Sequence, residues 1–404
     1  MRKYFKEKLN NGLTVLIAEN ECSDVVSITF QVRAGSRYET EGERGYAHLL
    51  EHMLMKGTST RPSSFDVGAI ANRAGALLNA HTGRERIRIT AQVVKSRTEE
   101  LMELIADIGQ NPLFDAAILE NEKKIIQKES HVESRLVRES MGQVFAKHPL
   151  AESPLGIMED MMSATVQKLQ IYHSKHFVAG NAAIIITGGI TRECALELCN
   201  KYFGTLKSGG GVNMAAKQLH ENPGRKDIEV TREKESIMFC FPGEKISGRE
   251  RFALRIIRQY LVLGQSSRLQ QELRQKRGLA YHISAYFKLY SDAFLFCIEV
   301  ISPELSKVEE VVLENIYNLE KHLSPQIFEQ YKDQSNNGML RETNEDLFLN
   351  DFLAENWIYW GELLTPVEAV EITNSLTYQD IVEIINRLFK KENLYVVRLV
   401  PPKK

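Results

Sequence analysis

The sequence predicts an α+β protein built from two similar domains. Its 404 residues exceed what one hydrophobic core usually supports, so two domains of about 200 residues are expected. Strand-like alternation and helical periodicity follow one another without a regular βαβ order, which favours mainly antiparallel sheets with helices packed on them. A segment of the first half also matches one of the second half without a gap, which indicates an internal duplication.

Composition and charge are those of an ordinary soluble protein, with 43% hydrophobic and 26% charged residues. Because 51 Lys and Arg stand against 53 Asp and Glu, no charge excess points to nucleic acid or to an anionic membrane as a partner. The N-terminus lacks the apolar run of a secretory signal, and no segment is long enough to span a bilayer. Five cysteines without Cys-x-x-Cys spacing favour a reducing, cytoplasmic location without disulfides.

The first elements are expected to be strands. Residues 13–20 follow a turn at 10–12, and residues 25–35 alternate in the period of a half-buried strand. This pattern predicts an opening hairpin. Residues 46–56 then change to helical periodicity, and residues 78–94 return to alternation.

Two longer helices and a linker follow. The helices are expected at 97–109 and 115–135, separated by an Asn-Pro step. Glycine and turn residues cluster at 207–214 and 221–224, which is where a linker is expected. The predicted organisation is an N-terminal domain at 1–208, a linker at 209–224 and a C-terminal domain at 225–404.

The duplication depends on one clear segment in each half. Aligning residues 63–64 with 266–267 brings Gly75 onto Gly278, with helical periodicity before each glycine and strand alternation after it. In this register the segment RFALR at 251–255 aligns with HLLEH at 48–52 in the first half. Only the first half therefore carries the two histidines and the glutamate of this segment.

The segment HLLEH places three polar side chains on the apolar side of a helix. Residues three and four apart share one face, so His48, Glu51 and His52 lie together beside the leucines. Leaving such groups buried without partners would cost about 1–3 kcal/mol each. Two imidazoles at this spacing can hold zinc, and the glutamate can act as base for a water whose pKa the metal lowers to about 7. The alternative is two helix histidines with a solvent-facing glutamate.

A zinc site of this kind needs a third ligand from another helix. Glu122 and Glu129 are seven residues apart, which places both on one face of the helix expected at 115–135. Glu133 and His131 are competing candidates. A solvated charged face is the structural alternative for any of these side chains.

Four segments of the first half form a combined pattern: GSRYE at 35–39, GYAHLLEHMLMKGT at 45–58, LNAHT at 78–82 and NPLF at 111–114. Together they resemble the pitrilysin and insulinase family of zinc peptidases, in particular its two-domain branch that includes mitochondrial processing peptidase. The resemblance implies a duplicated fold, one zinc ion per subunit and the inverted His-x-x-Glu-His order of ligands and base.

The resemblance also assigns roles around the metal. It implies that His48, His52 and Glu129 are the ligands, that Glu51 is the catalytic base and that Glu122 is a supporting acidic residue. Two neighbours depart from the family pattern, because Lys128 and Ser130 replace acidic and apolar residues there.

Further site residues are implied outside HLLEH. The segment 264–281 resembles the family stretch in which an arginine and a tyrosine seven apart bind substrate and assist catalysis, which maps onto Arg274 and Tyr281. The alternative is a helix-surface arginine and a tyrosine at a sheet edge. The resemblance also implicates Asn79 and Ala80 in an edge strand that binds an extended peptide through its main chain.

The predicted function is therefore a zinc endopeptidase acting on unfolded peptides or oligopeptides. The alternative is a non-catalytic scaffold or a substrate-binding subunit of a heterodimeric peptidase. Because longer relatives place four such domains in one chain, a two-domain chain is expected to form a homodimer or a heterodimer with a related subunit.

Overall fold

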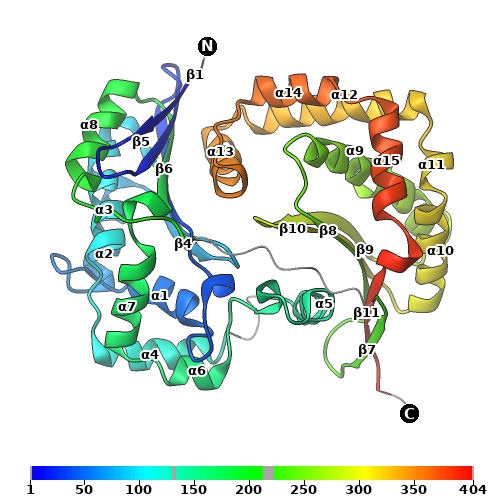
Figure 1. The fold of residues 1–404 in the computed structure, drawn as a ribbon, viewed down its shortest axis with the longest axis horizontal. Helices are drawn as coiled ribbons and strands as arrows, with labels where there is room; N and C mark the ends of the chain where they lie inside the picture. The colour runs from blue at the N-terminus through cyan, green and yellow to red at the C-terminus, as the bar shows by residue number, and fades with distance from the viewer. Residues whose placement is uncertain (1, 130–132, 213–222, 403–404) are drawn as a thin grey trace. The chain divides into compact units, whose positions relative to one another are not determined.

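The chain folds into two compact units, shown in Figure 1. The computed structural model describes residues 2–129, 133–212 and 223–402. None of the helices in these ranges combines the length and apolar character that crossing a bilayer requires. Unit 1 comprises Met1–Val132, Glu152–Ala215 and Glu342–Thr365, and unit 2 comprises Glu133–Ala151, Ala216–Arg341 and Pro366–Lys404.

Unit 1 contains a six-stranded sheet in the order β1-β2-β6-β3-β5-β4. Neighbouring strands are antiparallel except β2 and β6, which are parallel. The strands are β1 (Lys3–Lys8), β2 (Thr14–Glu19), β3 (Val25–Val32), β4 (Leu77–Thr82), β5 (Ile87–Val94) and β6 (Ala182–Gly188).

The hairpin predicted between residues 13–20 and 25–35 is wrong, because β6 lies between β2 and β3. Strand β6, AAIIITG, is buried along its whole length, and a continuous apolar run of this kind favours a central position. The actual hairpin joins β1 to β2 through the turn at 10–12.

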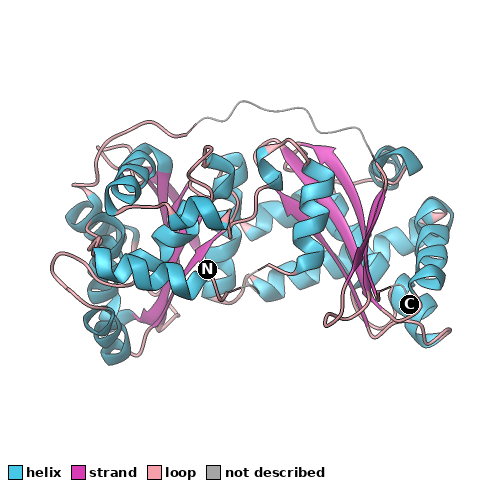
Figure 2. Ribbon diagram, turned by 90° about the horizontal axis from the view of Figure 1, so that it is seen from below, coloured by secondary structure: helices cyan, strands magenta, loops and turns pink. Residues whose placement is uncertain are grey.

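Alternate residues of this sheet point into two separate cores. On one face, Val15, Ile28 and Ile184 pack against a layer of helices, whereas Leu16 and Ile185 belong to a second cluster on the opposite face. The helical layer appears with its sheet in Figure 2. It contains α1 (Tyr46–Leu54), α2 (Ser64–Ala74), α3 (Thr98–Gln110), α4 (Ala116–Ile126), α6 (Met158–Met162), α7 (Val166–His176) and α8 (Arg192–Phe203).

The opposite face is covered by α13 (Asp346–Trp360), although this helix comes late in the sequence. Leu353 and Trp357 supply apolar contacts there. Asn350 is fully buried, and its side-chain amide donates to the carbonyl oxygens of Ser27 and Ile185, both at 3.0 Å. The apolar cluster and these bonds attach α13 to unit 1.

Unit 2 repeats the arrangement with a five-stranded sheet in the order β7-β11-β8-β10-β9. Its strands are β7 (Arg225–Glu229), β8 (Ser236–Glu244), β9 (His282–Leu289), β10 (Ala293–Ile301) and β11 (Tyr395–Val400). Its helices are α5 (Arg135–Phe145), α9 (Glu250–Val262), α10 (Leu305–Tyr317), α11 (Leu319–His322), α12 (Pro325–Glu342), α14 (Pro366–Asn374) and α15 (Tyr378–Leu388).

Strand pairing in the two sheets confirms the internal duplication. In unit 2, β7 and β11 are parallel while β11, β8, β10 and β9 are antiparallel in turn, which repeats the series β2, β6, β3, β5 and β4. Gly75 and Gly278 both have φ +63° and precede the last hairpin of their sheet. The predicted α+β fold with two similar sheet-and-helix domains is therefore correct.

Each unit contains a helix from the other half of the sequence. A single domain boundary in the linker therefore does not describe the two units. The helix predicted at 115–135 ends earlier than expected, because α4 ends at Ile126. A separate helix, α5, starts at Arg135 and packs on β8 and β11 of unit 2. Leu136 and Phe145 of α5 cover the apolar face of the second sheet, as α13 covers that of the first. Each unit thus includes a segment from the other half of the chain, whereas the sequence suggested continuous halves.

The start of α1 is stabilised from outside the helix. Gly45 at its N-cap has φ +102° and no side chain, so it cannot cap the free N–H groups of the first turn. Glu39 does this instead, accepting from Gly45 N at 2.8 Å and from Ala47 N at 2.7 Å. Burial raises the pKa of Glu39 to about 8, although these two bonds favour its charged form.

Glu39 should make stability depend on pH. Its folded-state pKa of about 8 lies above the usual glutamate pKa of 4.5, so the stability gained from proton binding is complete below about pH 4.5 and is lost as the pH rises towards 8. We expect the free energy of unfolding of the metal-free protein to fall over this range relative to Glu39→Gln. Urea unfolding at several pH values measures this difference. Glu41→Gln, at an exposed neighbour, is the control, and a pH-independent difference would contradict the assignment.

Candidate metal centre

Helix α1 carries HLLEH on a segment whose apolar side chains are completely buried. Leu49, Leu50 and Met53 pack in the core of unit 1. His48 is 5% exposed, and His52 and Glu51 are half-buried. The core contacts therefore fix the rotation of the helix, which aims both imidazoles at the turn that follows α4.

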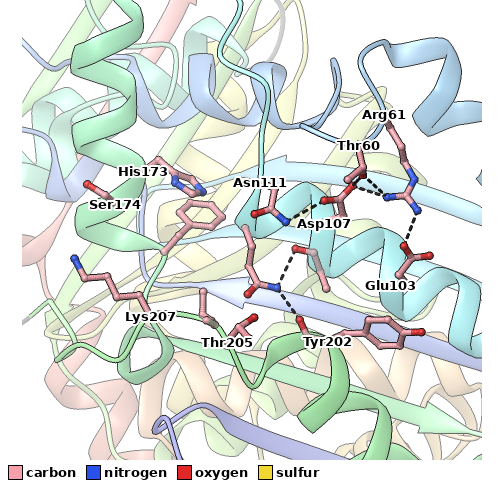
Figure 3. A pocket seen from close by; sticks show the side chains of 14 residues that line it. Thr60, Arg61, Glu103, Asp107, Asn111, His173, Ser174, Tyr202, Thr205 and Lys207 are labelled. Atoms are coloured by element: carbon pink, nitrogen blue, oxygen red, sulfur yellow. Dashed lines mark hydrogen bonds and ion pairs between the residues drawn. The ribbon is translucent and has the colours of Figure 1, made fainter.

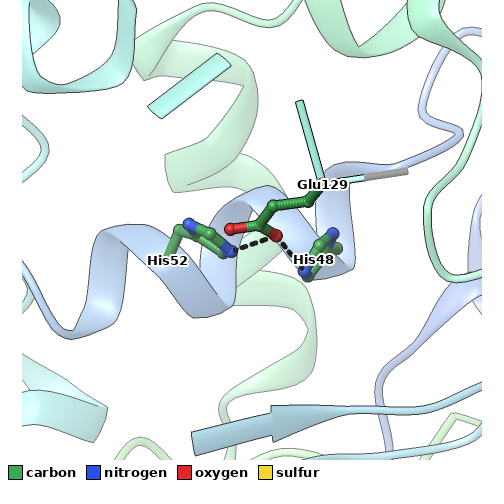
Figure 4. Close-up of side chains that lie close together, drawn as sticks. All are labelled: His48, His52 and Glu129. Carbon is green, nitrogen blue, oxygen red and sulfur yellow. Dashed lines mark ion pairs between the residues drawn. The ribbon is translucent and has the colours of Figure 1, made fainter. Parts of the chain in front are cut away.

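The three predicted ligands lie together within unit 1, as Figure 4 shows. Glu129 Oε2 is 3.8 Å from His48 Nε2 and 3.5 Å from His52 Nε2. The two rings are nearly perpendicular, with centroids 4.8 Å apart. Tetrahedral zinc with bonds of about 2.0–2.2 Å places donor atoms about 3.3–3.6 Å apart. The two imidazole nitrogens and the carboxylate oxygen, all within 4.8 Å of one another, are the donor types and number of a zinc site with three protein ligands.

Glu129 reaches the histidines from a turn rather than from a continuous helix. After α4 ends at Ile126, the N–H of Glu129 donates to the Ile126 carbonyl at 2.9 Å. The inference that Glu122 and Glu129 share a helix face therefore needs correction, although both carboxylates contact the histidines of α1.

Of the two competing ligands, only Glu133 lies among the described residues, and it is not part of this group. Glu133 falls in unit 2, and among the described residues the donor group contains only the three predicted side chains. His131 lies outside the described residues, as does Ser130. Lys128 is exposed.

Glu122 supports one of the two histidines. Its carboxylate is 4% exposed, and Oε2 lies 2.9 Å from His52 Nδ1. Its other oxygen, Oε1, lies 2.8 Å from Lys56 Nζ. A carboxylate that accepts from Nδ1–H leaves Nε2 with a free lone pair, which is the form a metal ligand needs. Lys56 was not identified from the sequence, although it lies one turn after His52.

His48 is held in the form that can donate to a metal. Burial, together with the neighbouring His52 and His81, lowers its pKa to about 4. The imidazole is therefore neutral at physiological pH, as coordination requires. Among the described residues its Nδ1 has no hydrogen-bond partner.

Glu51 lies on the same helix, between the two histidines in sequence. Burial raises its pKa, and hydrogen bonds from the side chain and backbone of Thr82 lower it. Thr82 ends β4, so the edge of the sheet positions this carboxylate. A half-buried carboxylate with a raised pKa can accept and return a proton nearer to neutral pH than an exposed one. Thr82 is a second contact that the helix pattern alone did not reveal.

Strand β4 carries the predicted peptide-binding residues at the edge of the sheet. Within the described sheet it pairs only with β5. Asn79 is exposed and Ala80 is half-buried. A groove of about 330 Å³ runs along this strand and is closed on one side by Leu347 and Asp351 of α13. The edge therefore offers free main-chain groups beside a groove, as addition of a peptide strand requires.

Arg274 and Tyr281 belong to unit 2. Arg274 lies in a π-helical segment, Gln270–Gln275, and its side chain is exposed. Tyr281 is 74% exposed, and its N–H donates to the carbonyl of Ile301. Neither side chain has a hydrogen-bond partner within the part of the chain that the structure describes. Their catalytic and substrate-binding roles stay predictions.

A second cavity in unit 1, of about 600 Å³, contains none of the donor residues (Figure 3). Its wall includes Asp107, which accepts hydrogen bonds from the side chains of Thr58, Thr60, Arg61 and Asn111. These bonds connect the loop after α1 to the end of α3. The residues of this cavity wall thus belong to a hydrogen-bond network that holds the loop after the C-terminal end of α1.

Comparison with known proteins shows one family throughout. Residues 14–154 match the profile of insulinase, peptidase family M16, and residues 163–335 match the profile described as peptidase M16 inactive domain. An uncharacterized zinc protease of Rickettsia felis is 28% identical over 392 residues, covering 95% of this chain and 94% of that protein. Mitochondrial-processing peptidase subunit beta of Neurospora crassa is 25% identical over 401 residues, covering 94% and 84%.

Solved structures agree with this result at the level of the fold. A protease from Helicobacter pylori superposes with a TM-score of 0.91 at 20% identity, covering 99% of this chain and 100% of that one. An M16-like peptidase from Alicyclobacillus acidocaldarius gives a TM-score of 0.87 at 16% identity, with 99% of each chain covered. The chain therefore belongs to the insulinase family of peptidases, M16, as the motifs around His48 predicted.

Proposed function

We propose that this protein is a zinc-dependent endopeptidase that hydrolyses unfolded peptides and oligopeptides. The observation that carries the proposal is the convergence of His48 Nε2, His52 Nε2 and Glu129 Oε2 beside the carboxylate of Glu51. The names of several relatives as zinc proteases support it. When bound, one zinc ion per subunit would supply a Lewis acid that polarises a carbonyl and lowers the pKa of water to about 7.

In this proposal, residues of the chain transfer the proton, orient one ligand and bind the substrate. Glu51 takes the proton from the attacking water and returns it to the leaving amine. Glu122 holds His52 in the tautomer that leaves Nε2 free. The edge of β4 at Asn79 and Ala80 binds the substrate as an added strand, which selects extended peptides and excludes folded proteins.

The competing proposal is a non-catalytic subunit that binds peptides or supports an active partner. It is favoured by the description of the second matching profile as an inactive domain. That profile covers residues 163–335, whereas the donor residues and Glu51 lie before it. A complete set of ligands and base in the first half is what an active subunit needs, so we favour the peptidase.

Metal content tests the ligand assignment. We expect one zinc ion per chain in the wild-type protein and a large loss in Glu129→Ala, because removing one of three protein ligands leaves too few donors. Glu120→Ala, on the helix α4 that precedes Glu129, is a matched control, since its side chain is 57% exposed. Elemental analysis after dialysis against a weak chelator gives the occupancy. Full zinc occupancy in Glu129→Ala would contradict the assignment and implicate Glu133 or His131.

Peptide cleavage separates the two proposals. With a quenched fluorescent peptide, we expect chelator-sensitive hydrolysis by the wild type. Glu51→Gln should keep zinc and fold but lose about 10² to 10⁴-fold of the rate, as expected for removal of a positioned base. Near-normal turnover in this variant would mean that another group activates the water. Absence of cleavage by zinc-loaded wild type across unrelated peptides would instead favour the non-catalytic subunit.

We also propose that two subunits form one working assembly, with Arg274 and Tyr281 of one acting at the zinc of the other. A homodimer gives two equivalent sites related by two-fold symmetry. Mixing inactive Glu51→Gln with inactive Tyr281→Phe should restore activity, because one site of the mixed dimer keeps both groups. Since Tyr281 is 74% exposed, its replacement should not disturb folding. Demonstrated subunit exchange without recovered activity would exclude action in trans.

A further inference from the structure

Lys56 lies just after the C-terminal end of α1, four residues after His52. Helix α1 ends at Leu54, and the N–H of Lys56 donates to the Met53 carbonyl at 3.1 Å, which continues the helical turn. Its side chain is 30% exposed, and Nζ lies 2.8 Å from Glu122 Oε1. This is a charge-assisted contact at the short end of the usual range.

Glu122 therefore has a separate partner for each carboxylate oxygen. Oε1 meets Lys56 Nζ and Oε2 meets His52 Nδ1, at 2.8 and 2.9 Å. The two contacts together define the plane of the carboxylate. Without Lys56, Oε1 would lose its charged partner in a side chain that is 95% removed from solvent, and the carboxylate would be free to rotate.

The contact is important because it acts on only one histidine. His52 has a carboxylate behind its ring, whereas His48 Nδ1 has no hydrogen-bond partner among the described residues. Packing alone orients His48, which is almost completely buried, but His52 is half-buried and depends more on its hydrogen bond. The orientation of His52 is thus linked to the position of Glu122.

We propose that Lys56 is a positioning residue for the metal centre: it fixes Glu122, and through Glu122 it holds His52 with Nε2 directed at the metal. The inference rests on the proposed zinc site. Lys56 itself touches neither metal nor substrate. Its contribution is the fixed geometry of the carboxylate that orients the ligand.

Zinc affinity, measured by competition with a chromophoric chelator, tests this role without any assay of activity. Loss of a partner behind a metal ligand typically weakens binding about 10–100-fold. Because Lys56 acts one contact further out, we expect Lys56→Met to weaken zinc binding about tenfold. Lys56→Arg keeps a cation within reach of Glu122 and should retain most of the affinity. Lys56→Gln lacks the charge and should also bind zinc weakly. This variant replaces Lys56→Met in the test if Lys56→Met does not fold.

A double-mutant cycle identifies the route of the effect. In the background of Glu122→Gln, Lys56→Met should cause no further loss, because the carboxylate it positions is already absent. Lys201→Met is the matched control, since Lys201 pairs with Glu99 on the exposed surface of the same unit. This control should bind zinc like the wild type.

The outcomes distinguish this inference from the proposed zinc site. Wild-type affinity in Lys56→Met, or an equal loss with and without Glu122, would overturn the role of Lys56 while leaving the ligands in place. An arginine variant no better than the methionine variant would contradict the requirement for a cation. Zinc retained in Glu129→Ala would instead refute the site on which the inference rests.

Discussion

Helix α1 buries its leucines and Met53 in the core of unit 1 while holding two imidazoles and a carboxylate along one side. This packing fixes the rotation of the helix, and the direction of His48 and His52 follows from it. The other side chains of the site come from different elements and contact α1, whose orientation the core packing sets. Glu129 arrives from the turn after α4, Glu122 lies behind His52, and Thr82 at the sheet edge donates to Glu51.

Contacts at both ends keep this helix in place. Glu39 caps the two free N–H groups at its start, where a glycine offers no side chain. After its end, the Asp107 network secures the loop, and Lys56 joins the helix to α4 through Glu122. The two imidazoles of the proposed metal site thus lie on a helix that is restrained at its core face and at both termini, which is the rigidity that a preorganised metal site needs.

Sequence periodicity was sufficient where a feature depends on residues close in the chain. The α+β class, the duplication and the shared face of His48 and His52 all follow from local patterns. Partners from distant segments were not visible in this way. The insertion of β6 between β2 and β3, and the transfer of α13 onto the first sheet, each depend on apolar faces that only the folded chain brings together. The contact between Lys56 and Glu122 was missed for the same reason, since a lysine after a helix is usually solvated.

The most direct test of the account is X-ray absorption at the zinc edge of the purified protein. The geometry of His48, His52 and Glu129 predicts two imidazole ligands per zinc, with nitrogen and oxygen donors at about 2.0–2.2 Å and no sulfur. Glu51→Gln should give the same spectrum, because the proposed role of Glu51 is that of a base and not of a ligand. A single imidazole, a sulfur donor at about 2.3 Å, or a change of ligands in Glu51→Gln would contradict the central claim.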